Sequence, residues 1–216
     1  MSKNLYCIRH GLAEHNVNYL KYGCKTFYDP NFIDTSLVEE GFKQASNLGE
    51  TWLNKKDPSG TGSNKKDPSG TGTNKKDIEL VIVSPLKRTL QTATEIFKDT
   101  SVPIISFELA REYPIGGHTC NKRSKKEYLM KMFPNINFDG IKEGEDYLWN
   151  PEVEESIHEL DLRINTFKKF IEKRPEKNIA LVSHASFIGQ MKDKHIKYIE
   201  NGEEELKHCY PYLIKI

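Results

Sequence analysis

Continuous apolar runs that stop abruptly at polar residues constrain the fold of this chain more than any other feature. Residues 78–84 read Ile-Glu-Leu-Val-Ile-Val-Ser, and residues 178–184 read Asn-Ile-Ala-Leu-Val-Ser-His. Runs of this length and composition are typical of parallel strands that are buried on both faces of a sheet. The chain has 216 residues, enough for one α/β domain with a sizeable core. We therefore expect a single α/β domain over residues 1–216.

Helical periodicity separates these strands. Apolar residues recur at three- and four-residue spacing over residues 42–53, starting at Phe42, and Ser36 with Glu39 has the pattern of a capping box before them. The same spacing recurs over residues 152–174 in Val153, Ile157, Leu160, Ile164, Phe167, Phe170 and Ile171. Shorter patterns predict a helix within 11–22, one from about Pro85, a strand over 102–107, a helix over 124–133 and an edge strand over 209–216.

A low-complexity insert occupies about residues 54–77. A ten-residue unit, Asn-Lys-Lys-Asp-Pro-Ser-Gly-Thr-Gly-Ser, occurs twice with one change and then begins a third time. The unit has no apolar side chain, so it cannot contribute to a core, and we expect a surface loop between a helix and a strand. The Asp in every unit argues against a basic patch for phosphate or a partner.

Composition excludes several classes of protein. The formal net charge is +1, which gives no strong attraction to nucleic acid or to a membrane. The four cysteines are widely spaced and show no metal-ligand pattern, and the chain has neither a signal peptide nor an apolar run of membrane length. We therefore expect a cytoplasmic protein without a nucleic-acid or membrane partner. The alternating C-terminal tail leaves pairing in a homo-oligomer open.

Arg9, His10 and Gly11 follow the first apolar run, where a plain strand end would not need them. The guanidinium is a planar donor suited to phosphate oxygens, and the imidazole can serve as nucleophile or proton carrier near neutral pH. Glycine allows the backbone to turn tightly and to pass close to a ligand. The stretch predicts a loop that binds an anion such as phosphate.

Three further segments make the pattern specific. Residues 34–45 read Asp-Thr-Ser-Leu-Val-Glu-Glu-Gly-Phe-Lys-Gln-Ala, residues 84–93 read Ser-Pro-Leu-Lys-Arg-Thr-Leu-Gln-Thr-Ala, and the last apolar run ends in His184. Together with Arg9-His10-Gly11, these segments resemble the histidine phosphatase superfamily, also called phosphoglycerate-mutase-like, over nearly the whole chain. The resemblance implies a three-layer α/β/α fold with a mostly parallel central sheet.

The resemblance also implies a catalytic set, which comprises His10, Arg9, Arg88, Glu112 and His184. In this family the first histidine takes up the phosphoryl group, the arginines and the second histidine bind it, and a carboxylate after the third strand carries the proton. Glu112 lies one residue beyond the commonest spacing, so Glu108 competes for this role. No metal and no cofactor are implied.

Four further positions are expected to bind substrate: Asn16, Gly23, Arg123 and Ala185. Asn16 and Gly23 match a phosphate-binding and a substrate-facing position, although each can instead serve as a helix cap. Arg123 has the place of a residue that holds a distal anionic group, with a surface arginine as the alternative. Ala185 stands where glycine is usual after the second histidine, and Tyr147 and Trp149 are placed to cover the pocket.

Histidines and a cysteine outside the family pattern are expected to have structural rather than catalytic roles. The histidines without a useful spacing are expected to have surface or capping roles: His15, His118, His158, His195 and His208. Cys120 is expected to be packed rather than reactive.

The same motifs favour one branch of the family. Mutases carry Glu-Ser after Arg-His-Gly and continue Glu-Arg-His-Tyr-Gly after the third strand, whereas this chain has Leu12-Ala13 and Glu-Tyr-Pro-Ile-Gly from Glu112. We therefore expect a phosphomonoester hydrolase that acts through a phosphohistidine on a small phosphorylated metabolite. A cofactor-dependent phosphoglycerate mutase and a catalytically silent phospho-ligand-binding protein are the alternatives.

Overall fold

A computed structural model describes residues 2–53, 78–194 and 206–216 of the chain. The predicted repeat insert at about residues 54–77 lies outside the described residues, and so does His195.

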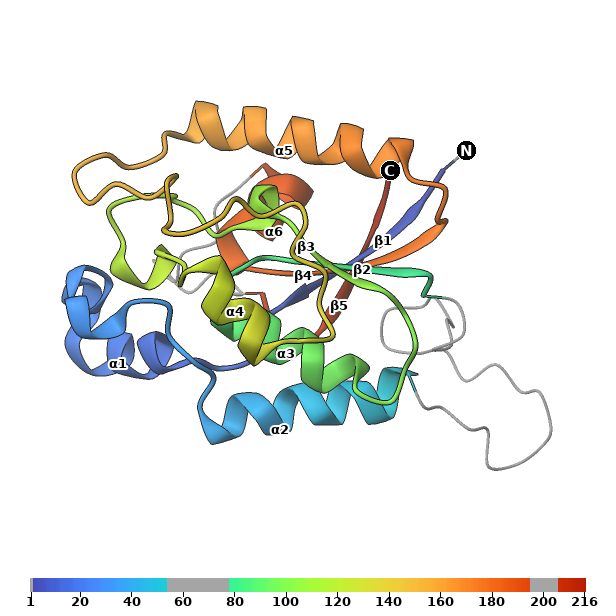
Figure 1. The fold of residues 1–216 in the computed structure, drawn as a ribbon, viewed down its shortest axis with the longest axis horizontal. Coiled ribbons are helices and arrows are strands. Elements are labelled where there is room, and N and C mark those ends of the chain that lie inside the picture. Colours follow the sequence, from blue (N-terminus) through green and yellow to red (C-terminus); the bar gives the residue numbers. More distant parts are fainter. Residues whose placement is uncertain (1, 54–77, 195–205) are drawn as a thin grey trace.

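The centre of the described structure is a five-stranded, mostly parallel sheet with the strand order β3-β2-β4-β1-β5 (Figure 1). Three of the four strand pairs are parallel. The predicted edge strand is β5, which pairs antiparallel with β1. The strands are β1 (Asn4–Arg9), β2 (Leu80–Val83), β3 (Ile104–Ser106), β4 (Asn178–Ser183) and β5 (Pro211–Lys215).

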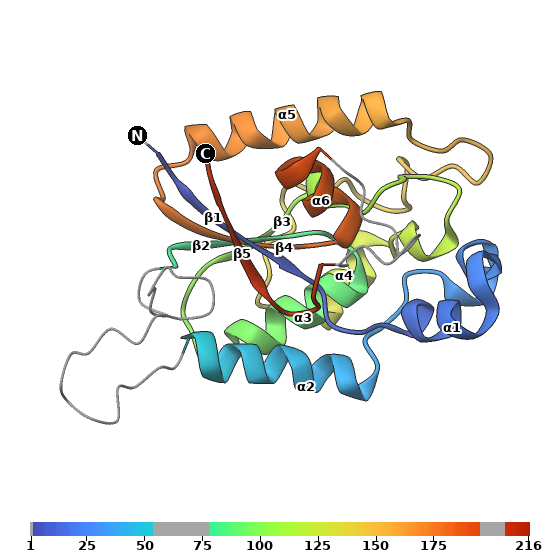
Figure 2. The same cartoon turned by 180° about the vertical axis from the view of Figure 1, so that it is seen from behind.

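Helices cover both faces of this sheet, which confirms the predicted three-layer α/β/α fold. Figures 1 and 2 show α2 and α3 on one face and α5 and α6 on the other. The α-helices are α1 (Glu14–Tyr22), α2 (Glu39–Leu48), α3 (Lys87–Phe97), α4 (Lys126–Met132), α5 (Ile157–Lys173) and α6 (Ala185–Asp193). Shorter helical turns are η1 (Gly23–Tyr28), η2 (Pro30–Phe32), η3 (Gly49–Leu53), η5 (Glu108–Ala110) and η6 (Thr119–Asn121).

The two layers of core follow from the alternation of side chains along each strand. On β1, Tyr6 and Ile8 pack with the α2 and α3 side, whereas Leu5 and Cys7 pack with the α5 and α6 side. Successive side chains of a strand point to opposite faces, and each face of this sheet is covered by an apolar helix stripe. The central strands are therefore apolar throughout, as their sequences indicate.

The start of α2 differs from the prediction. The helix begins at Glu39 with Val38 as its N-cap, and Phe42 is exposed rather than part of the buried stripe. Ser36 lies two residues before this N-cap and does not cap the helix; its N–H donates to Glu14 Oε2 and its carbonyl accepts from the N–H of Glu14. These bonds tie the segment before α2 to the start of α1.

The long helix α5 begins later than its periodicity suggests. It starts at Ile157, where the N-cap Ser156 and Glu159 form a reciprocal capping box. Val153 and Ile157 are exposed, so the buried stripe starts only at Leu160. The capping bonds explain this boundary, because Ser156 supplies the oxygen that the first free N–H groups of the helix need.

Candidate active site

The register of the sheet brings His10 and His184 together. Arg9 lies opposite Ser183 in the β1–β4 pair, so the next residue of each strand, a histidine in both, projects at the same carboxyl edge. The N–H of His10 donates to the carbonyl of Ser183 over 3.0 Å, and the two imidazole centroids are 5.2 Å apart. Open α/β sheets bind ligands at this edge.

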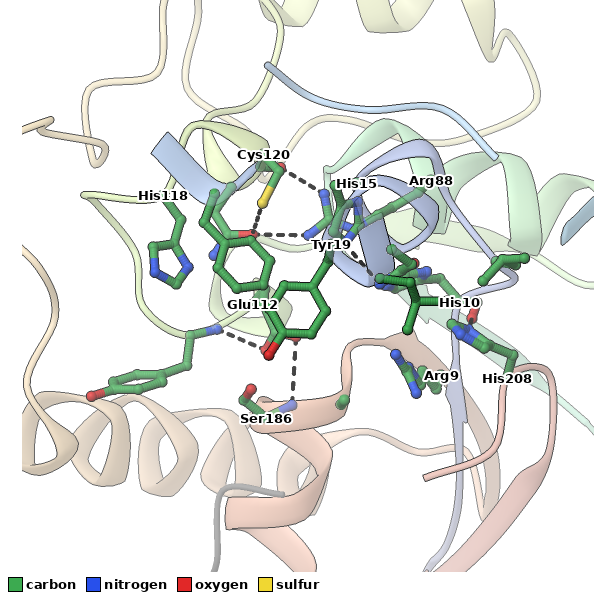
Figure 3. A pocket seen from close by; sticks show the side chains of 17 residues that line it. Arg9, His10, His15, Tyr19, Arg88, Glu112, His118, Cys120, Ser186 and His208 are labelled. Carbon is green, nitrogen blue, oxygen red and sulfur yellow. Dashed lines mark hydrogen bonds between the residues drawn. The ribbon is translucent and has the colours of Figure 1, made fainter. Parts of the chain in front are cut away.

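A cavity of about 160 Å³ opens at this edge (Figure 3). Its described lining comes from the end of β1, from α1, η1, α3, η6 and α6, from the segment between η5 and η6, and from the C-terminal segment. The lining residues are Arg9, His10, Leu12, His15, Asn16, Tyr19, Leu20, Phe27, Arg88, Glu112, Tyr113, His118, Cys120, Asn121, Ala185, Ser186 and His208.

The hydrogen bonds of His10 leave Nε2 available. Its Nδ1 lies 2.7 Å from the carbonyl oxygen of Gly11, and because a carbonyl can only accept, Nδ1 carries the proton. In the neutral ring the lone pair is then on Nε2. Burial is the main cause that holds the pKa of His10 well below 6.5, and the nearby charges of Arg88 and His184 add to it. His10 is therefore a neutral imidazole at physiological pH.

His184 is fully buried beside His10. Its Nε2 lies 2.8 Å from the hydroxyl oxygen of Ser84, the residue that follows β2. Its Nδ1 has no hydrogen-bond partner among the described residues, which is costly for a buried polar atom unless a ligand supplies the bond. Burial, followed by the charge of Arg88, lowers the pKa of His184 well below 6.5.

Two arginines place positive charge in the pocket. Arg88, on the first turn of α3, donates from Nη1 to the carbonyl of Cys120 over 2.6 Å and from Nη2 to Asn121 Oδ1 over 2.9 Å. Burial lowers its pKa, but a guanidinium stays protonated in proteins. Arg9 donates from Nη1 to the carbonyl of Leu206 over 2.8 Å. These bonds hold both guanidinium groups in fixed orientations.

Glu112 lines the pocket at the N-terminus of α6. Its carboxylate accepts the N–H of Tyr113 over 2.8 Å and that of Phe187 over 3.2 Å. Burial raises the pKa of Glu112, against the opposing effect of these N–H donors and of Arg88. A carboxyl group with a raised pKa beside a nucleophile is suited to carry a proton.

Glu108, the alternative candidate for the proton carrier, lies outside the cavity lining. It forms ion pairs with Arg123 over 2.8 Å and with Arg111 over 3.4 Å, and it does not line the cavity. Of the two glutamates, the structure brings only Glu112 to the histidine pair.

Arg123, expected to hold a distal substrate group, lies outside the cavity lining. Its side chain is buried, its Nε bonds Glu108, and its Nη atoms donate to the carbonyls of Ser124, Lys142 and Gly144. These bonds use four of the five guanidinium N–H groups, and they join separate loops to one another. Arg123 is not among the residues that line the cavity.

The other expected substrate-binding residues divide into two groups. Asn16 and Ala185 line the cavity, where Asn16 accepts the N–H of Ala13 and contacts His15 Nε2 through its amide nitrogen. Gly23 does not line it. It ends α1 with φ of +65°, a backbone conformation that favours glycine, so its capping role accounts for the residue.

Three pocket residues were assigned surface or capping roles in error. His15 is buried and bonds Thr35 Oγ1 over 2.7 Å, His118 stacks on a pocket aromatic ring, and His208 bonds the carbonyl of His10. Their positions depend on contacts distant in sequence, although the place of His15 directly before Asn16 could have drawn attention to it. His158 is exposed, as expected.

The structure also shows whether Cys120 is packed and whether Tyr147 and Trp149 cover the pocket. Cys120 is packed, and burial raises the pKa of its thiol to about 11. Tyr147 and Trp149 do not line the cavity, but Trp149 Nε1 donates to the carbonyl of His118 and so supports the wall from behind.

Among residues 2–53, 78–194 and 206–216, no group of three or more His, Cys, Asp or Glu side chains is placed to hold a metal ion. Within the same ranges, no helix has the length and apolar character needed to cross a membrane.

Comparisons with known proteins identify the family of the chain. The sequence is 31% identical over 218 residues to phosphoglycerate mutase-like protein 1 of Arabidopsis thaliana, covering 86% of this chain and 69% of that protein. A probable phosphatase of Schizosaccharomyces pombe is 26% identical over 85% of this chain and 74% of its own. The fold resembles that of a putative alpha-ribazole-5'-P phosphatase from Escherichia coli, with a TM-score of 0.52 and 20% identity over 89% of this chain and 78% of that one. The profile of the histidine phosphatase superfamily (branch 1) matches residues 70–199, and the chain belongs to this family.

Proposed function

We propose that the chain is a phosphomonoester hydrolase that works through a phosphohistidine at His10. The observation that carries the proposal is the state of His10, whose Nδ1–H is bonded to Gly11 and whose Nε2 therefore presents its lone pair in a pocket that also holds Arg9 and Arg88. Cations and donors around a phosphoryl group stabilise the charge spread over its equatorial oxygens.

In the first step, His10 Nε2 attacks phosphorus and the P–O bond to the alcohol breaks. Protonated Glu112 gives its proton to the leaving oxygen, so the alcohol departs neutral. In the second step, a water molecule attacks the phosphohistidine and gives its proton to the Glu112 carboxylate. The P–N bond breaks, its electron pair returns to Nε2, and inorganic phosphate leaves. The proposal uses neither a metal nor a cofactor.

The fate of the phosphohistidine separates a phosphatase from a mutase. A mutase returns the phosphoryl group to a bound acid, and mutases carry Glu-Ser where this chain has Leu12-Ala13. Leu12 lines the cavity with an apolar side chain, and Ala13 is buried. These residues support transfer to water rather than to a carboxylate-bearing acceptor.

The test is release of inorganic phosphate by the purified chain from a panel of sugar phosphates, phosphoglycerates, nucleotides and phosphopeptides. We expect release from at least one class, loss of that release in His10→Ala, and unchanged release in His158→Ala, the exposed-histidine control. Acid quenching should destroy the phosphoenzyme and alkaline quenching should preserve it, as the P–N bond requires.

Two outcomes would contradict the proposal. Interconversion of phosphoglycerates with a bisphosphate primer, faster than phosphate release, would identify a mutase. Tight phosphate binding without turnover of any phosphomonoester would identify a silent binding protein.

A further inference from the structure

One wall of the pocket is a stack of three flat rings. The Tyr19 and Phe27 rings are 5.0 Å apart at 18° to each other, and the Phe27 and His118 rings are 4.8 Å apart, also at 18°. All three line the cavity, from α1, η1 and the loop before η6. Figure 3 shows His118 and Arg9 at opposite sides of the cavity. The His118 end of the stack therefore lies away from Arg9, whereas Tyr19 lies between them (Figure 3).

This wall is held in place by its surroundings. Tyr28 meets the His118 ring edge-on at 5.3 Å, and Trp149 Nε1 donates to the His118 carbonyl over 2.9 Å. Thr119 Oγ1 donates to the carbonyl of Phe27 over 3.0 Å, which ties the two sides of the stack together. A wall with fixed rings loses little conformational entropy when a ligand binds.

The wall consists of aromatic rings and carries no cation, and Phe27 is the ring that stacks on both of the others. Arg9 and Arg88 are the charged basic residues of the described lining, since burial lowers the pKa of His118 and keeps its ring neutral. Two lysines between η6 and α4 have partners outside the cavity lining. Lys125 pairs with Glu145 over 3.0 Å, and Lys122 lies over the Trp149 ring at 4.8 Å. A second anionic group on the substrate would meet no counter-charge from the described part of this wall.

We propose that the preferred substrate is a phosphomonoester whose alcohol carries a flat, unsaturated ring, seated against Tyr19, Phe27 and His118. The inference rests on the proposed phosphatase function and assigns the substrate class of the same site. Aromatic faces pack offset on other flat rings and exclude water from them, whereas a small charged acid loses hydration there without compensation.

Matched substrates test the role of ring flatness. 2-Phenylethyl phosphate and 2-cyclohexylethyl phosphate have the same linker and leaving-group chemistry and similar bulk, but only the first has a flat ring. We expect kcat/KM to be about three- to tenfold higher for the phenyl compound, the range that an aromatic contact provides. We expect 3-phosphoglycerate to be a poorer substrate than either. Equal values for the two ring compounds, or preference for phosphoglycerate, would overturn the inference.

Variants locate the effect on the wall. Phe27→Leu keeps apolar bulk but removes the flat ring on which both Tyr19 and His118 stack, so the phenyl preference should fall to near unity, while Phe27→Tyr should retain it. Tyr22→Leu is the matched control, because Tyr22 is an exposed aromatic residue of α1 outside the cavity lining. A preference that survives Phe27→Leu, or one that Tyr22→Leu also removes, would place ring recognition elsewhere.

A binding measurement separates this inference from the proposed function. Calorimetry with His10→Ala should give tighter binding of 2-phenylethylphosphonate than of 2-cyclohexylethylphosphonate, by the same three- to tenfold. If no phosphomonoester is hydrolysed by the natural chain and this difference persists, the hydrolase proposal fails and the ring site stands. If hydrolysis occurs without any difference in binding, the ring site fails and the hydrolase stands.

Discussion

His208 donates a hydrogen bond from Nδ1 to the backbone carbonyl of His10 over 2.5 Å, joining residues 198 positions apart. The N–H of Cys209 donates to the carbonyl of Arg9 over 2.9 Å in the same place. The segment that leads into β5 thus holds the loop of the nucleophile from the side opposite β4. The imidazole centroids of His10 and His208 are 5.6 Å apart, and both rings line the cavity.

Removing this bond should weaken catalysis without unfolding the chain. A net hydrogen bond contributes about 1 kcal/mol, so we expect His208→Ala to lower kcat/KM about fivefold or more. Lys207→Ala, a change at an exposed neighbour, should leave it unchanged. Steady-state kinetics with thermal denaturation curves for both variants gives the answer. Wild-type kinetics in His208→Ala would mean that the backbone bonds from Ser183 and Cys209 hold the loop without the His208 side chain.

Glu112→Gln should impair chemistry while leaving the fold intact. A positioned acid contributes roughly 10²- to 10⁴-fold, and glutamine cannot donate a proton to the leaving oxygen, so kcat should fall within that range. Inhibition by inorganic phosphate should change much less. With 4-nitrophenyl phosphate, whose leaving group departs without protonation, the rate at which His10 is phosphorylated should approach that of the natural chain. Hydrolysis of the phosphohistidine should stay slow, because glutamine cannot take the proton from water.

Glu108→Gln is the matched control and should have the opposite signature. It removes one carboxylate from buried Arg111 and Arg123, and breaking a buried ion pair costs about 3–5 kcal/mol. We expect a lower free energy of unfolding, with the kcat of the folded variant close to that of the natural chain. If Glu108→Gln lost kcat and Glu112→Gln did not, the proton carrier would have to be reassigned.

Gly11→Ala should displace the nucleophile loop. A Cβ at Gly11 would lie 2.5 Å from the carbonyl oxygen of Gly41, in the first turn of α2. Because that oxygen belongs to backbone, either the loop or the helix must move, and we expect kcat to fall about tenfold or more, since small misplacements at a reacting centre are expensive. Gly144→Ala, with no atom within 4 Å of the added Cβ but a positive φ, should reduce stability without a comparable loss of kcat.

The buried histidines predict how stability depends on pH. Burial lowers the pKa of His10, His15 and His184 well below 6.5 and that of His208 to about 4. Below pH 6.5 the unfolded chain binds protons at these rings and the native chain does not, so the free energy of unfolding should fall as pH falls. The slope is about 1.4 kcal/mol per pH unit for each such ring.

Urea denaturation at pH 7, 6 and 5 measures this slope. His15→Gln should make it shallower by about one proton, whereas His158→Ala, at an exposed position, should not alter it. A free energy of unfolding that stays constant from pH 7 to 5 would mean that these rings titrate normally in the folded chain.

The contacts of Glu112, Arg123 and Gly11 could not be predicted from the sequence. Spacing left both Glu108 and Glu112 open, and the ion pairs of Glu108 with Arg111 and Arg123 separated them. Arg123, expected to bind substrate, instead pairs with Glu108 and bonds the carbonyls of neighbouring loops. Gly11 was expected to allow a close approach to a ligand, but the backbone that approaches it is that of Gly41. Each of these contacts is made with a residue that the local sequence pattern does not identify.

Local patterns in the chain were sufficient for the strands, the layered α/β architecture and the placement of His10 and His184 at strand ends. Periodicity and strand length act over a few residues, and parallel pairing then aligns the carboxyl ends at one edge. The ring wall of Tyr19, Phe27 and His118 and the contact of His208 with His10 arise from packing between segments far apart in sequence. Such contacts depend on how the loops fold over the sheet edge, which no periodicity within a segment encodes.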